Sequence, residues 1–146
     1  MYRVDDRDRV VPLKDLPQSS VGAPSPLLLA GEGTVILAYY LQSRVANWDG
    51  KSVRVIDPTD SDEPIALVRF KSCAAHMFGR PNDEAFSGHP LAGRGLKPYG
   101  TFRVEESSWV RQLERMNSVH PNHDPRADES LQHLVFAFHD STFECV

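Results

Sequence analysis

The sequence predicts an α+β protein that is mainly β: a curved antiparallel sheet, forming a sandwich or half-barrel, with one covering helix near residues 108–118. Three observations support this fold class. Short apolar runs recur between turn-forming residues, as in strands. Only one segment places apolar residues at helical spacing. The last residues alternate between two faces, as in a hairpin. An open antiparallel sheet with the helix packed across it is the alternative.

The chain begins with a segment that has no regular period. Residues 1–26 are rich in proline and charged side chains, so we expect an irregular arm with a short edge strand around Val10 and Val11. Residues 27–146 then form a single globular domain, because a chain of 146 residues fits one domain with a real core.

Several strands are expected before the helix. Their ranges are 27–30, 34–42, 52–57, 65–71 and 101–105. The run at 34–42 is apolar on both faces, which indicates a central strand. In the run at 65–71, Val68 and Phe70 alternate with charged residues, as in a half-buried strand. Asp49-Gly50 is a turn signal, and it places Trp48 at an exposed hairpin tip, a hint of a contact surface.

The single strong helix has a start and a stop signal. Ser107 or Ser108 can cap its first turn, and His120-Pro121 ends it. Its apolar stripe consists of Trp109, Val110, Leu113 and Met116.

The segment LVFAFHDSTFECV predicts a hairpin that folds at Asp140-Ser141, so that Phe138 faces Phe143. One face then carries Leu134, Phe136, Phe138, Phe143 and Cys145, and the other carries Ala137, His139, Thr142 and Glu144. Because antiparallel sheets commonly have one solvent-exposed face, we expect the second face of this hairpin to be polar and to face the solvent.

Composition excludes some classes of function. The formal net charge is −4, and the sequence contains no basic tail or basic patch. A general nucleic-acid binder is therefore not expected. The charged start lacks the apolar region of a secretory signal, and no apolar run is long enough to span a membrane. Cys73 and Cys145 lie within strand-like segments, which favours buried thiols in a reducing cytoplasm, with a disulfide between them as the lesser alternative.

A first candidate site lies in the hairpin. His139 and Glu144 share its second face, with Asp140 at the tip, and an imidazole beside carboxylates is a general acid–base arrangement. We therefore assign these three residues as candidate catalytic groups. The alternative is an ordinary polar sheet face on which Asp140 only makes the turn.

A second candidate site is the long loop at residues 79–100. Loops of this length are uncommon and are either functional or disordered, but interleaved apolar residues argue against disorder here. The candidate ligand-binding residues are His89, Asp83, Glu84, Arg80 and Arg94. Glycines let backbone amides approach an anionic ligand, although no dinucleotide or phosphate-loop fingerprint is present. The alternative is a surface excursion pinned by Phe86, Leu91 and Tyr99.

A third candidate is a divalent metal held by His120 and His123, because imidazoles with a carboxylate are common ligands. The spacing matches no established metal motif, and Pro121 breaks the helix that would align the two rings.

These features favour a small binding or interaction module that holds a protein partner or a small polar ligand. The alternatives are a small metal- or acid–base-dependent enzyme, and a structural subunit whose terminal hairpin is covered by another chain. A homo-oligomer is compatible with each. The short strands with one helix resemble sandwich or barrel proteins such as cupins, but the cupin metal motif is missing.

Overall fold

The computed structural model describes residues 2–42, 57 and 62–146. Apart from Asp57, the strand expected at 52–57 lies outside these residues, as do Trp48 and the Asp49-Gly50 turn. The described chain is mainly β, with two antiparallel sheets, one α-helix and three short 3-10 helices. The predicted fold class is confirmed.

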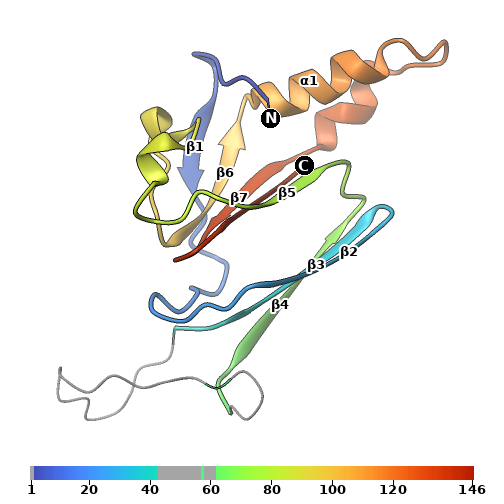
Figure 1. Ribbon diagram of the computed structural model, residues 1–146. Helices are drawn as coiled ribbons and strands as arrows, with labels where there is room; N and C mark the ends of the chain where they lie inside the picture. The colour runs from blue at the N-terminus through green and yellow to red at the C-terminus, as the bar shows by residue number, and fades with distance from the viewer. Residues whose placement is uncertain (1, 43–56, 58–61) are drawn as a thin grey trace.

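The two sheets form separate layers (Figure 1). The larger has five strands in the order β1 (Arg9–Pro12), β6 (Gly100–Glu105), β7 (His133–Ala137), β8 (Thr142–Cys145) and β5 (His76–Gly79). The smaller has the order β2 (Leu27–Gly31), β3 (Thr34–Tyr40) and β4 (Ile65–Lys71). The short edge strand expected around Val10 and Val11 is β1.

The space between the sheets holds an aromatic core. Phe136 and Phe143 are directly opposite each other on β7 and β8. Their rings meet Phe70 of β4, and Tyr39 of β3 packs against Phe136 with ring centroids 6.2 Å apart. The apolar face predicted for the terminal hairpin is therefore correct in its members, and it is what joins the two layers.

The second face of the larger sheet is also buried, contrary to the outward, polar face that the sequence predicts. Val135, Ala137 and Thr142 are almost inaccessible there, and so is Glu144. The helix α1 (Ser108–Asn117), the arm and the long loop cover this face. It is covered by the chain itself, so the structural-subunit hypothesis, which needed another chain to cover it, loses its basis.

The terminal hairpin has a different register from the predicted one. Phe138 N–H donates to Ser141 O over 2.9 Å, so the two turn residues are His139 and Asp140. Phe136 consequently faces Phe143, where the sequence predicts Phe138 in that position. The slip spans two residues, so the strand residues stay on their expected faces, but His139 moves into the turn and does not share a face with Glu144. Alternation has a period of two, so it cannot distinguish these registers, and the turn decides between them.

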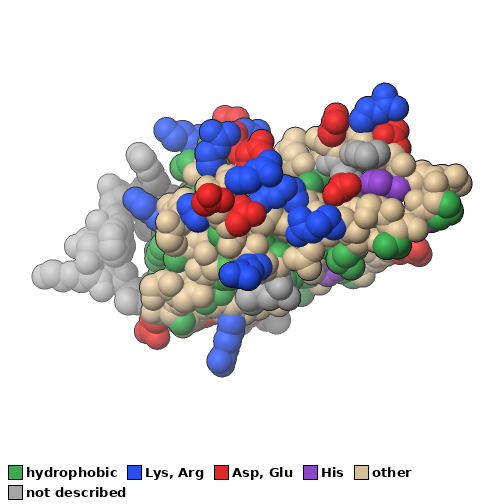
Figure 2. All heavy atoms as spheres, turned by 90° about the horizontal axis from the view of Figure 1, so that it is seen from above, with side chains coloured by type: hydrophobic (Ala, Val, Ile, Leu, Met, Phe, Trp, Pro, Cys, Tyr) green, Lys and Arg blue, Asp and Glu red, His purple; other side chains and the backbone are tan. Residues whose placement is uncertain are grey.

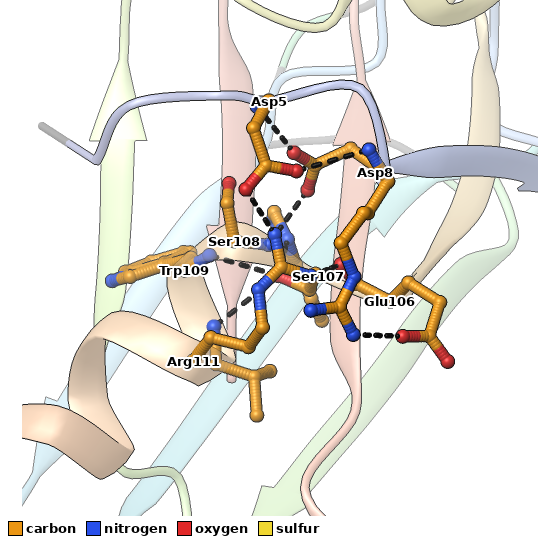
Figure 3. Close-up of polar contacts among 10 residues, drawn as sticks. Asp5, Asp8, Glu106, Ser107, Ser108, Trp109 and Arg111 are labelled. Atoms are coloured by element: carbon orange, nitrogen blue, oxygen red, sulfur yellow. Dashed lines mark hydrogen bonds and ion pairs between the residues drawn. The ribbon is translucent and has the colours of Figure 1, made fainter.

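Helix α1 begins under a double cap that ties it to the arm (Figure 3). Ser107 Oγ accepts hydrogen bonds from the backbone N–H groups of Trp109 and Val110, as predicted for a cap. Asp8 is buried, and its Oδ1 accepts from Ser108 N–H at 2.7 Å. The arm is therefore hydrogen-bonded to the start of α1, whereas the sequence predicts an arm that only lies on the surface. Because the far end of α1 projects beyond the sheet (Figure 1), Met116 is 61% exposed although it belongs to the predicted stripe.

The face seen from above in Figure 2 carries Lys and Arg side chains interleaved with Asp and Glu. Ion pairs among the described residues include Arg7–Glu106, Arg9–Glu105 and Arg111–Asp5. No broad basic surface is presented on this face. In the described part of the chain, no helix has the length and apolar character needed to cross a membrane.

Candidate functional site

The most unusual polar group is the carboxylate of Glu144, which is 6% exposed within the core beneath helix α1. It accepts from Tyr2 Oη at 2.6 Å and from His133 Nε2 at 2.9 Å, both at Oε2. His89 Nε2 lies 3.2 Å from the other oxygen, Oε1. Four separate segments therefore meet at this carboxylate: the arm, the long loop, β7 and β8.

The hydrogen-bond partners fix which nitrogen of each imidazole carries a proton. Leu91 N–H donates to His89 Nδ1 at 3.1 Å, so the ring proton lies on Nε2 and points to Glu144. Ser107 Oγ already accepts two backbone N–H groups, so its hydroxyl proton goes to His133 Nδ1 at 2.8 Å. His133 in turn donates from Nε2. Tyr2, His89 and His133 therefore all donate to the carboxylate of Glu144. Together with Ser107, which donates to His133, these residues form what we call the Glu144 network.

The Glu144 network determines the ionisation of its central group. Burial alone would raise the pKa of Glu144, but the hydrogen bonds from His133, His89 and Tyr2 outweigh burial and lower this pKa to about 2. The same burial, together with the nearby carboxylate, raises the pKa of Tyr2. Glu144 is therefore a carboxylate at neutral pH, and Tyr2 is a phenol.

This arrangement is poorly suited to the acid–base chemistry expected of Glu144, and it is poorly suited to metal binding as well. A general base must reach the proton that it removes, but this carboxylate is buried and already accepts three hydrogen bonds. A metal would need the lone pairs on Nε2 of His89 and His133, which hold protons instead. Ser107 lies in line with His133 and Glu144 but is buried and caps a helix, so it is no nucleophile. The Glu144 network is best explained as a structural centre.

An open pocket of about 650 Å³ lies between the long loop and the hairpin turn. Its lining consists of Arg80, Pro81, Asn82, Ala85, Gly88, His89, Pro90 and Asp140. The side chain of His89 is only 2% exposed, so this residue links the pocket wall to the Glu144 network rather than reaching into the pocket. Arg80 is exposed and forms no ion pair with any described residue.

A polar cluster stands beside this pocket at the hairpin turn. His139 Nδ1 lies 3.1 Å from Asp140 Oδ1 and 3.8 Å from Asp83 Oδ1. The Tyr99 hydroxyl donates to Asp83, which is the main reason why the pKa of Asp83 is lowered. The structure thus groups His139, Asp140 and Asp83, whereas Glu144 belongs to the buried network.

The remaining candidates lie away from the pocket. His123 Nε2 is 3.1 Å from Glu114 Oε1 at the end of α1, and His120 Nδ1 accepts from Asn122 N–H. Across residues 2–42, 57 and 62–146, no group of three or more His, Cys, Asp or Glu side chains is arranged to hold a metal ion. Glu84 and Arg94 are exposed on the long loop and do not line the pocket.

The sequence did not place three members of the Glu144 network beside this carboxylate: Tyr2, His133 and Ser107. His133 alone had a signal, because it alternates in phase with Val135 and Ala137 on the face of β7 that Glu144 shares. Tyr2 lies in an arm without any pattern, and Ser107 was recognised only as a helix cap.

No protein-family model, curated protein or solved structure matches this chain. The geometry of the described residues is therefore the basis for a functional proposal.

Proposed function

We propose that the protein is a small binding module, in which the pocket between the long loop and the hairpin turn holds a small polar ligand through an anionic group of that ligand. The observation that carries this proposal is Arg80, an exposed guanidinium in the pocket lining without an ion-pair partner among the described residues. Guanidinium groups bind carboxylates and phosphates through paired hydrogen bonds.

The rigid support of the loop favours binding. Phe86, Leu91 and Leu96 anchor it in the core under α1. Asp83 N–H donates to His139 O at 2.9 Å, and the Thr142 hydroxyl donates to Pro81 O at 3.0 Å, so the loop is tied to the hairpin as well. A preformed pocket loses little conformational entropy on binding, and ligand sites are commonly built in this way.

Asp140 narrows the chemistry of the ligand. It is the carboxylate among the lining residues, and its side chain is well exposed. It would repel a purely anionic ligand but accept a hydrogen bond from an amine or hydroxyl group. A carboxylic acid that also carries an amine or hydroxyl group therefore fits both Arg80 and Asp140.

The test is a thermal-shift and calorimetric screen of amino acids, hydroxy acids and inorganic phosphate. We expect a hydroxy or amino acid to bind and Arg80→Ala to weaken that binding at least about tenfold, the loss of roughly one charge-assisted hydrogen bond. Arg94→Ala is the matched control, because Arg94 is on the same loop but outside the pocket. An absence of binding across the screen, or equal effects of the two variants, would contradict the proposal.

A second candidate function, acid–base catalysis on the same ligand, has one specific observation in its favour. His139 stands between Asp140 and Asp83 at the edge of the pocket. Under this alternative, His139→Ala would abolish turnover of a bound ligand while leaving its affinity within about twofold. A cytoplasmic location belongs to the proposal too, and is supported by the two free thiols of Cys73 and Cys145.

A further inference from the structure

The outer face of the smaller sheet is apolar and open to solvent. Leu27 is 69% exposed, Leu29 67%, Ile65 54% and Leu67 74%. In Figure 1 this sheet is the layer farthest from α1, and its inner face packs on the larger sheet. Contiguous exposed apolar surface of this kind marks an interaction site in most proteins.

The strand register makes this face continuous. Leu27 and Leu67 lie on either side of Ala38, in a row that crosses all three strands. In the next row, Leu29 and Ile36 lie beside each other. The core therefore explains why one side of β3 is apolar, whereas no element of residues 2–42 and 62–146 covers the other side.

Charges are arranged unequally along β4. Arg69 and Lys71 share the outer face with Leu67 and lie toward the end of the strand. Asp62 is exposed just before the start of the strand. None of these three side chains forms an ion pair with a described residue. Along β4 itself, the end at Lys71 is therefore basic, and the segment that leads into the strand carries the carboxylate of Asp62.

We propose that a second copy of this chain covers the outer face of the smaller sheet, with the two sheets packed face to face across a two-fold axis. The axis would cross the strands along the row of Leu27, Ala38 and Leu67. It reverses the strand direction between copies, so Leu67 meets its own equivalent and Ile65 faces Arg69 of the other copy.

Charge complementarity favours this occupant. With the strands reversed, the basic end of β4 in one copy lies over the acidic end of β4 in the other. Lys71 of each copy then lies near Asp62 of the other copy, so the dimer contains this contact twice. With the strands parallel and β4 over β4, Arg69 would oppose Arg69, which is unfavourable. A strand that is apolar at its centre and oppositely charged at its two ends is complementary to itself, as a two-fold interface requires.

The first test is sedimentation of the full chain over a range of concentrations. We expect a reversible dimer for the wild-type protein and a monomer for Leu67→Glu, which places two carboxylates at the axis. Met116→Glu is the matched control, because Met116 is an exposed apolar residue on α1. Circular dichroism should show that both variants remain folded. A wild-type protein that stays monomeric, or a dimer that survives Leu67→Glu, would overturn the proposal.

A charge exchange tests the orientation of the two copies. Asp62→Arg and Lys71→Glu should each weaken the dimer by roughly tenfold, and the double variant should return to within about threefold of wild type. If the double variant is weaker than both single variants, the copies are not reversed in this way. Binding to anionic vesicles with a monomeric protein in solution would assign the face to a lipid surface instead and would equally refute the dimer.

Discussion

The phenol of Tyr2 donates a hydrogen bond of 2.6 Å to Glu144, a residue 142 positions later in the chain. The ring of Tyr2 is also stacked on Trp109 at 5.1 Å between centroids. The arm is therefore attached to both the terminal strand and helix α1 by one side chain. Since a buried carboxylate must have its hydrogen bonds satisfied, this contact joins the arm to the folding of the whole larger sheet.

Glu144→Gln should destabilise the protein by about 2–4 kcal/mol, because an amide NH₂ would face imidazole donors at a position that now only accepts. Urea unfolding monitored by tryptophan fluorescence measures the loss. His139→Ala is the control: its side chain is 40% exposed, so we expect a change below about 0.5 kcal/mol. Equal losses in the two variants would show that the Glu144 network contributes little to stability.

The stability of the protein should fall in acid because of Glu144. The pKa of this group is 4.5 in its ordinary state and about 2 in the folded protein. The folded pKa is the lower one, so the stabilisation is fully present above pH 4.5 and is lost as the pH falls toward 2. The difference corresponds to roughly 3 kcal/mol. Urea unfolding at a series of pH values checks this, and the pH dependence should be flatter in Glu144→Gln than in wild type.

Phe136→Ala should cost about 3–5 kcal/mol, because it removes a buried ring from the core between the two sheets. The midpoint of thermal or urea unfolding gives the value. Phe78→Ala is a suitable comparison, because Phe78 is an exposed ring that also contacts Phe143. A similar loss in both variants would mean that the two sheets are not held together by this core.

The two thiols should react slowly with a thiol reagent in the native protein. Burial raises the pKa of Cys145 and of Cys73, and only the thiolate is reactive. Cys145 should be protected at neutral pH and Cys73, which is half-buried, should react first. Labelling of Cys73→Ser isolates Cys145, and both cysteines should react at once in urea. Rapid labelling of native Cys145 would show that β8 opens easily.

The elements of the fold could be predicted because their signals are local. The 34–42 run, the Trp109 stripe and the alternation of the terminal hairpin each depend on neighbouring residues. The coverage of the second hairpin face was not predictable in this way. It depends on Tyr2 and Leu91, which reach the sheet from distant segments and carry no periodic pattern.

The candidate site shows the same division. The long loop was recognisable from its length and glycines, and it does line the pocket, with Arg80 and His89 among the predicted residues. The partners of Glu144 were not recognisable as a set, because Tyr2 carries no pattern and the phase of His133 on β7 does not by itself show that its ring is buried. Distinguishing His89 and His133 from His120 requires the tertiary packing that buries the first two.

The strand order of the larger sheet has a consequence for synthesis of the protein. Among the described strands, β5 is hydrogen-bonded to β8 alone, and β8 contains residue 145. During translation, β5 therefore has no strand to pair with until more than sixty further residues have been added, because its residue His76 pairs with Cys145. Until then the backbone of Met77 and Phe78 lacks its hydrogen bonds to β8. A nascent chain stalled before β8 should therefore be prone to aggregation and should be a substrate for chaperones.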